Sequence, residues 1–315
     1  MSMNEFTKKY YSIKPLIPRR VQIMLRRYVA YRTRHLNSNV WPIDPGAGAS
    51  PPGWQGWPDG KRFALVLTHD VDTQRGHDRC LQLMKLEQEA GVRSSFNFVA
   101  EDYAVSEEIR HHLATSGFEV GVHGLRHDCS LFHNSEEFLQ QSARINRYLS
   151  DWGAVGFRSP CMYHNLPLMH NLNITYDAST FDTDPFEPQP DGFSTIFPFF
   201  VAGEGNGQKG YVELPYTLPQ DFTLFILLKE RNLEVWKRKL DWVVAHGGMA
   251  LLITHPDYMS FDGKPAAYDE YPASCYHELL NYITDHYHGQ YWHALPKEVA
   301  ELWSSRYGVR HEAGV

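Results

Sequence analysis

The sequence predicts an α/β protein built from parallel strand–helix units, and three observations support this fold class. From about residue 62 onward, short apolar stretches alternate with longer amphipathic ones, which is typical of parallel β/α units. Polar side chains follow the predicted strands, as expected where chemistry gathers at the carboxyl ends of a sheet. The length of 315 residues also matches an α/β barrel with a short extension.

The alternation can be followed element by element, because short runs rich in β-branched and aromatic residues predict strands and apolar residues spaced three and four apart predict helices. Strands are predicted at residues 63–67, 95–100, 119–123, 156–159, 174–179, 211–214, 249–254 and 291–295. Helices are predicted at residues 81–90, 106–116, 135–152, 233–245, 275–288 and 296–307. These units could close into a barrel or form an open, doubly wound sheet.

The positions of the polar residues favour the closed barrel. A barrel turns all its strand ends toward one mouth, whereas an open sheet concentrates its site near one switch point. Here the polar residues are spread over the ends of many successive strands. The residues expected at the mouth are Asp70, Asp72, His123, His127, Arg158, Asp177 and His255.

Two histidines that follow the third predicted strand indicate a mononuclear metal site. His123 and His127 are four residues apart, a spacing that places two side chains on one face of a helical turn. Asp70 and Asp72 are two apart, so in extended chain they point the same way. Two imidazoles and a carboxylate match the protein ligands of a catalytic zinc site. Iron, cobalt, nickel and manganese are also compatible with this ligand set.

The N-terminal part differs in composition, which predicts an extension over residues 1–60 and a barrel over residues 61–315. Residues 1–36 hold nine Lys/Arg against Glu5 alone, a charge of +8, so the rest of the chain carries −15 of the total of −7. A basic amphipathic helix is predicted at residues 19–35. We prefer that it packs on the domain or on a second subunit, and the alternative is contact with an anionic lipid surface or an acidic polymer.

Residues 37–60 are rich in Pro, Gly and Trp, which predicts an arm without regular structure. We expect its tryptophans to pin the arm onto the barrel rather than to bind a ligand. They are Trp41, Trp54 and Trp57.

Composition also narrows the class of protein. The acidic body argues against a nucleic-acid partner. We find neither a secretory signal nor an apolar run long enough to span a bilayer. The four cysteines include no Cys-x-x-Cys pair, which argues against a thiolate zinc site and a disulfide scaffold. We therefore expect a cytoplasmic protein with reduced thiols.

Four motifs, in order along the chain, resemble those of the polysaccharide deacetylase family, the NodB-type carbohydrate esterases of family four. The family's Thr-Phe-Asp-Asp-Gly has a counterpart in Thr-His-Asp-Val-Asp at residues 68–72, and its His-Ser/Thr-x-x-His in His-Gly-Leu-Arg-His at 123–127. Its Arg-x-Pro corresponds to Arg-Ser-Pro at 158–160, and its apolar strand ending in histidine to Leu-Leu-Ile-Thr-His at 251–255. More locally, residues 213–221 resemble members linked to bacterial surface-polysaccharide biosynthesis.

The resemblance implies a distorted (β/α)7-type barrel and a role for each polar residue at its mouth. By this likeness, one divalent ion, by default zinc, is held by Asp72, His123 and His127. The remaining roles are Asp70 as base, His255 as acid, Arg158 as the partner that orients Asp70, and Asp177 as support for Arg158 or His255. A neighbouring carboxylate, Asp177 or Asp257, is expected to keep His255 protonated.

The chain also departs from the family pattern. The second carboxylate of the first motif comes one position later than usual, as in a subgroup, so the roles of Asp70 and Asp72 could be exchanged. Asp72 is preferred as the ligand by analogy with that subgroup. His69 and His164 stand where the family has other residues. Each is expected to support or join the metal site or to be a structural hydrogen-bonding residue.

By resemblance, the expected activity is removal of an N-acetyl or related acyl group from an amino sugar in a cell-envelope saccharide or its precursor. One alternative is hydrolysis of a non-sugar amide or ureide at the same site. Another is a carbohydrate-binding protein that has lost turnover, although a pure binder would not need the complete set of acid, base and ligands.

Overall fold

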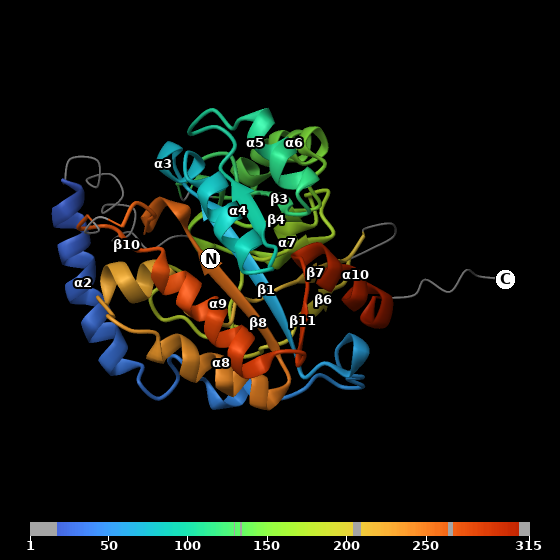
Figure 1. The fold of residues 1–315 in the computed structure, drawn as a ribbon. Coiled ribbons are helices and arrows are strands. Elements are labelled where there is room, and N and C mark those ends of the chain that lie inside the picture. Colours follow the sequence, from blue (N-terminus) through green and yellow to red (C-terminus); the bar gives the residue numbers. More distant parts are fainter. Residues whose placement is uncertain (1–17, 129, 133, 204–208, 264–266, 309–315) are drawn as a thin grey trace.

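The computed structural model describes residues 18–128, 130–132, 134–203, 209–263 and 267–308. Figure 1 shows the strands in the middle of the molecule, with helices around them and the N-terminal helix along one side. The main sheet comprises β1 (Phe63–Val71), β2 (Ser95–Phe98), β3 (Glu119–Val122), β4 (Gly156–Phe157), β5 (Tyr176–Asp177), β6 (Phe199–Val201), β7 (Tyr211–Glu213), β8 (Met249–Thr254) and β11 (Tyr291–His293).

Seven of these strands curl into a distorted barrel. Parallel pairing runs from β8 to β1 and onward through β2, β3, β4, β5 and β7. The ring closes beyond β7, where Leu218 forms an isolated parallel bridge with Leu252 of β8 and the N–H of Thr217 donates to the carbonyl of Leu251 at 3.0 Å. The two other strands pair at its margin, β11 with the start of β1 and β6 antiparallel to β7. The predicted (β/α)7-type barrel is thus confirmed.

Helices cover the outside of the barrel, and the six long helices predicted from residue 80 onward all form within about two residues of their predicted bounds. They are α4 (Cys80–Glu89), α5 (Glu107–Thr115), α6 (Ser135–Trp152), α8 (Glu234–His246), α9 (Ser274–Tyr287) and α10 (Pro296–Tyr307). The cap residues of α6 explain its sharp ends: the Asn134 side chain accepts the N–H of Glu137, and Gly153 ends the helix with φ of 63°.

Short elements connect these units. The short helices are α3 (Gln74–His77), α7 (Leu166–Met169), the π-helix η6 (Phe222–Leu227), and the 3-10 turns η2 (Pro45–Gly48), η3 (Pro58–Gly60), η4 (Ser130–Phe132), η5 (Pro160–Met162) and η7 (Pro256–Tyr258). A separate parallel pair is formed by β9 (Met259–Ser260) and β10 (Tyr271–Pro272). The sequence patterns did not predict β6, η6 or this pair, and β4 and β5 are shorter than predicted.

The core lies inside the barrel and between the barrel and its helices. All nine residues of β1 and all six of β8 are buried, because both faces of a strand in a parallel barrel are covered. This explains the continuous apolar runs at residues 63–67 of β1 and 249–253 of β8. The polar side chains at their carboxyl ends are therefore held in a rigid, largely dry setting.

The N-terminal extension packs against the barrel. Helix α2 (Arg19–Leu36) forms as predicted and lies along η6, where Nε of Arg27 donates to the carbonyl of Ile226 at 2.8 Å. In the arm, Trp57 is 3% exposed and its Nε1 donates to the carbonyl of Gly247 at 2.8 Å. The tryptophans thus pin the arm, as predicted. Residues 1–17 of the predicted basic segment lie outside the described residues, and the domain boundary at residue 60 stays a prediction.

The helices of the described ranges include none that is both long enough and apolar enough to cross a membrane.

Candidate metal centre

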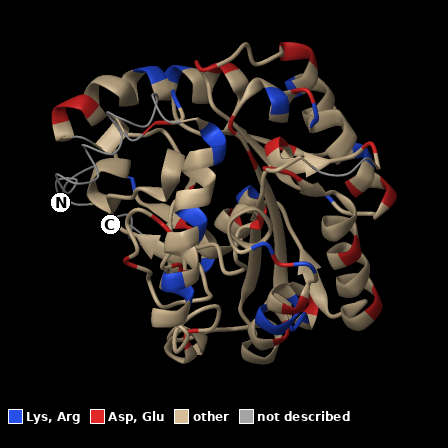
Figure 2. Cartoon of the chain, turned by 90° about the vertical axis from the view of Figure 1, so that its left-hand side faces the viewer, with Lys and Arg blue, Asp and Glu red and all other residues tan. Residues whose placement is uncertain are grey.

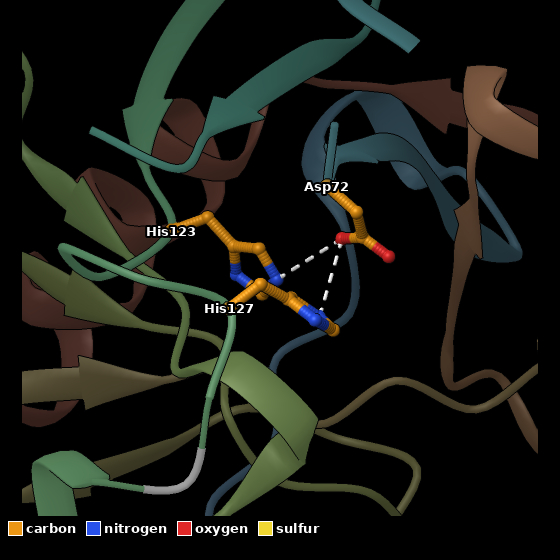
Figure 3. A group of neighbouring side chains, drawn as sticks. All are labelled: Asp72, His123 and His127. Carbon is orange, nitrogen blue, oxygen red and sulfur yellow. Dashed lines mark ion pairs between the residues drawn. The ribbon is translucent and has the colours of Figure 1, made fainter. Parts of the chain in front are cut away.

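Three side chains from two strand ends converge at the carboxyl-terminal mouth of the barrel. Asp72 directly follows β1, His123 directly follows β3, and His127 lies in the loop beyond it. Oδ1 of Asp72 is 3.6 Å from Nε2 of His123 and 3.3 Å from Nε2 of His127. Figure 3 shows the two imidazoles directed at this oxygen. One ligand atom from each residue lies within 4.8 Å of the others, so the three could hold one metal ion.

The two histidines meet through a bent loop and not through the helical turn that their spacing suggested. Residues 123–128 are irregular, and Gly124 adopts φ of 70°. A Cβ on Gly124 would lie 2.7 Å from Cγ of Pro160, so both the backbone conformation and the space require glycine. The N–H of His127 donates to Oδ2 of Asp102 at 2.7 Å, which fixes the far end of the bend.

Hydrogen bonds orient the candidate ligands from behind. Nδ1 of His123 donates to the carbonyl of Arg158 at 3.0 Å, which turns Nε2 toward Asp72. The N–H of Asp72 donates to Oδ2 of Asp257 at 3.0 Å, and Thr73 Oγ1 donates to Oδ1 of the same carboxylate. Asp257 therefore holds the turn after β1.

The environment of Asp72 fits a divalent cation. Its Oδ1 is buried and has no hydrogen-bond partner among the described residues, although two imidazole nitrogens face it. Burial would raise the pKa of Asp72, but the charges of His127, His123 and His255 outweigh burial and lower it. A carboxylate oxygen without a hydrogen-bond partner that faces two imidazole nitrogens matches the oxygen and nitrogen ligands of a zinc site.

Asp70 occupies a different environment from Asp72. Its Oδ1 accepts hydrogen bonds from Nδ2 of Asn97 at 2.9 Å and from Nη1 of Arg158 at 3.0 Å. Its Oδ2 is 4.0 Å from Nε2 of His123. Burial raises the pKa of Asp70, but the guanidinium of Arg158 and the imidazoles of His123 and His255 bring the net pKa below its usual range. These neighbours therefore favour the carboxylate form of Asp70 next to the ligand triad.

Arg158 is fully buried at the end of β4. Besides Asp70, it donates through Nε to the carbonyl of Ala178 at 2.9 Å and through Nη1 to Oγ1 of Thr68 at 2.8 Å. These contacts fix the plane of the guanidinium beside Asp70.

The carboxylate bonded to His255 is Asp221, which was not predicted from the sequence. Nδ1 of His255 is 2.7 Å from Oδ1 of Asp221, and the N–H of His255 donates to Oδ2 at 2.8 Å. Tyr271 also donates to Asp221 Oδ2, at 2.9 Å. Burial lowers the pKa of His255, but Asp221, followed by Asp72 and Asp70, raises it to about 10.

Asp221 could not be recognised from local pattern because it lies 34 residues before His255 and ends no predicted strand. It closes the stretch of residues 213–221, whose local likeness was the only signal for it. The expectation that Asp177 or Asp257 is the carboxylate paired with His255 is therefore corrected to Asp221.

Asp177 is buried in β5 beside Glu213 of β7. Its Oδ1 accepts from Oγ of Ser179 at 2.6 Å, and in the described ranges no hydrogen bond joins Asp177 to Arg158 or His255. Burial raises the pKa of Asp177 to about 6 and that of Glu213 well above its usual value. The charge of Arg158 reaches Asp177 only through space.

His69 and His164 lie apart from the three candidate ligands. His69 points to the opposite side of β1 from Asp70, where its Nε2 is 2.9 Å from Oε1 of Glu87 and its Nδ1 is 2.7 Å from Oγ1 of Thr254. This geometry is that of a buried structural network. Nδ1 of His164 is 3.2 Å from the carbonyl of Met162, and burial lowers the pKa of His164.

No protein-family model and no curated protein sequence matches the chain. Solved structures do match over most of its length. A protein from Mycobacterium smegmatis described as a polysaccharide deacetylase is 20% identical, with a TM-score of 0.62 over 81% of this chain and 95% of the other. Puue allantoinase is 16% identical, with a TM-score of 0.64 over 85% of this chain and 99% of the other.

A third match is a protein from Pseudomonas aeruginosa PAO1, also described as a polysaccharide deacetylase. It is 16% identical, with a TM-score of 0.62 over 86% of this chain and 100% of the other. At sequence identities of 16% to 20%, structural similarity shows a shared fold. The chain therefore has the distorted (β/α) barrel fold of these proteins.

Proposed function

We propose that the chain is a metal-dependent hydrolase of the family-four carbohydrate esterase type, which removes an N-acyl group from an amino sugar in a cell-envelope saccharide or its precursor. The observation that carries this proposal is the arrangement at the barrel mouth. It combines a triad able to hold a cation, a carboxylate oriented by arginine, and a histidine oriented by a second carboxylate.

Asp72, His123 and His127 would hold the ion, and zinc is our default, with iron, cobalt, nickel or manganese as alternatives. When bound, a divalent ion there would polarise the acyl oxygen and lower the pKa of water. In this proposal Asp72, and not Asp70, is the carboxylate ligand. Both hydrogen bonds described for Asp70 come from protein donors and converge on Oδ1, whereas Oδ1 of Asp72 has none.

Asp70 is proposed to accept the proton of the attacking water. A base must be ionised at the working pH, and the depressed pKa of Asp70 meets this condition. Arg158 positions the carboxylate and supports its charge. Its oxygen Oδ2, which is not engaged by Arg158, is the atom that faces the triad.

His255 is proposed to donate a proton to the leaving nitrogen. An amine leaves readily only when protonated, so the acid must carry its proton until the carbon–nitrogen bond breaks. Asp221 holds Nδ1 in its protonated form, so that Nε2 is the atom that can give a proton to substrate. Asp257, two residues after His255, accepts the N–H of Asp72 at 3.0 Å, which supports a position of His255 beside the proposed ligands.

The saccharide substrate is proposed from the motif resemblance and from two structural neighbours described as polysaccharide deacetylases. The likeness of residues 213–221 to proteins of surface-polysaccharide biosynthesis supports a cell-envelope precursor. This stretch contributes Glu213 and Asp221 to the buried polar groups around the site. A cytoplasmic location is part of the same proposal.

A second candidate keeps the site and changes the substrate to a non-sugar amide or ureide. It is favoured by the similarity to Puue allantoinase, with a TM-score of 0.64. The carbohydrate-binding protein without turnover is disfavoured, because a binding site has no use for the buried Asp221–His255 pair, whose burial is costly.

Incubation of the metal-loaded protein with a panel of acetamido and formamido sugars is expected to release acetate or formate, and a chelator is expected to abolish the release. Restoring the ion should restore the rate. Hydrolysis of ureides or cyclic amides alone would move the assignment to the second candidate. Saccharide binding without acyl release from any sugar, with the ion bound, would contradict the proposed reaction.

A further inference from the structure

Helix α2 turns its apolar side away from the protein. Among the described residues, nine large hydrophobic side chains are exposed, and seven of them lie on this one helix. Tyr28 is 66% exposed and Leu36 is 72% exposed. The seven are Val21, Met24, Leu25, Tyr28, Val29, Tyr31 and Leu36. Because the hydroxyl of Tyr31 donates to the carbonyl of Leu228 at 2.7 Å, we call the other six the apolar face of α2. A concentration of this kind is unusual for surface that stays in water.

The orientation of α2 is fixed by polar contacts on its other side. Besides its bond to Ile226, Arg27 donates through Nη2 to the carbonyl of Tyr268 at 2.9 Å, and Arg34 pairs with Glu230 at 2.5 Å. Ile23 and Ala30 are buried on this inner side. A helix that packs on a domain normally buries its apolar stripe, whereas α2 uses arginines as anchors and presents the stripe outward.

Cations accompany the apolar face. Val21, Leu25, Tyr28 and Arg32 are spaced three and four residues apart and so share one side of the helix. Exposed Arg20 and His35 also lie on α2, and the helix contains no Asp or Glu. Figure 2 views the molecule from the side on which α2 lies, with Lys and Arg in blue. An apolar stripe with basic residues and tyrosine suits the interfacial region of a bilayer.

Two partners could cover this face, a lipid surface or a second copy of the chain, and charge favours the lipid surface. Residues 1–36 carry +8, so pairing two α2 helices would bring two strongly basic segments together, which is unfavourable. An anionic lipid surface instead attracts the cations that are exposed beside the apolar face, such as Arg32. We propose that the apolar face of α2 docks in the interface of a membrane that contains anionic lipids, with α2 lying in the plane of the surface.

Docking would bring the barrel mouth close to the bilayer. The guanidinium of Arg26 lies 4.6 Å from the ring centroid of Phe222, whose ring contacts Tyr258 at 4.9 Å, and Tyr258 contacts His255 at 5.3 Å. Three side-chain contacts thus connect α2 to the proposed acid. The docking itself does not depend on the reaction proposed above.

The test is co-sedimentation of the full chain with vesicles of equal parts phosphatidylglycerol and phosphatidylcholine, compared with pure phosphatidylcholine. The wild type is expected to partition onto the anionic vesicles and to be released by high salt. Leu25→Glu combined with Val29→Glu is expected to lower the partition coefficient roughly tenfold or more. Arg32→Gln is expected to lower it about fivefold, on anionic vesicles only.

Leu139→Glu is the matched control, because Leu139 is a 50% exposed leucine on α6, and it is expected to leave partitioning unchanged. Light scattering of the same proteins tests self-association. A wild type that dimerises and becomes monomeric in the Leu25→Glu, Val29→Glu variant, without binding vesicles, would assign the face to a second copy and overturn the proposal. The proposal would also be overturned if all variants partitioned onto anionic vesicles as strongly as the wild type, or if the wild type did not bind these vesicles.

Discussion

Replacing Asp70 with asparagine is expected to lower kcat/KM by about a hundredfold to ten-thousandfold, the usual contribution of a general base, while the chain retains its metal. The amide oxygen of the substituted side chain can still accept the hydrogen bonds that Asn97 and Arg158 make to Oδ1. The fold and the three ligands should therefore survive, and only the proton acceptor is lost. The checks are steady-state kinetics and bound metal per chain.

Asp72→Asn is the matched control for this prediction, because it makes the same chemical change two residues away. It removes a proposed ligand, so activity and tightly bound metal should both fall. If instead Asp70→Asn lost the metal and Asp72→Asn kept it, the two carboxylates would have exchanged roles. Full activity in Asp70→Asn would contradict its role as base.

Replacing Asp221 with asparagine is expected to lower kcat by a similar factor of roughly a hundred or more and to shift the alkaline limb of the pH–rate profile to lower pH. Asp221 is the largest influence that raises the pKa of His255. An acid acts only while protonated, so its activity is present below its pKa and lost as the pH rises through it. Without Asp221 the pKa of His255 is lower, so activity is lost at a lower pH. A bound cation lowers the pKa of His255 in both proteins, which leaves the direction unchanged.

Two control variants test whether the shift of the alkaline limb depends on the carboxylate of Asp221 in particular. Tyr271→Phe removes one hydrogen bond to Asp221 but keeps the carboxylate, so it should move the alkaline limb less than Asp221→Asn. Asp177→Asn changes one of the two carboxylates expected beside His255 from the sequence. Among the described residues Asp177 makes no hydrogen bond to His255, so this variant should leave the limb in place. A limb that moved in Asp177→Asn and stayed in Asp221→Asn would refute the pairing.

The barrel and the positions of the ligands were predictable because their signals are local in the chain. The first five residues of β1, Phe63–Leu67, are a continuous apolar run that is soon followed by Asp70 and Asp72, and β3 leads directly into His123. Burial on both faces of parallel strands produces such runs. The closing of the ring through Leu218 is a single bridge, so no sequence pattern marks it.

Features that depend on contacts between distant segments could not be predicted. Asp221 reaches His255 only because η6 begins there and lies beside the end of β8. The bend at Gly124 replaces the helical turn that a four-residue spacing suggests, because tertiary packing against Pro160 decides the backbone. Likewise, the amphipathic pattern of α2 does not reveal which side faces the protein, since carbonyl groups of residues 226 and 268 bind Arg27.

The central claim is that Asp72, His123 and His127 hold one divalent ion at the barrel mouth, and bound metal per chain tests it most directly. Protein purified without chelator, or reloaded with zinc, is expected to hold about one ion per chain. His123→Ala and His127→Ala should each lose nearly all of it, whereas His69→Ala, which alters the histidine bonded to Glu87, should keep it. A wild type that binds no ion after reloading, or a His123→Ala variant that still holds one, would contradict the claim.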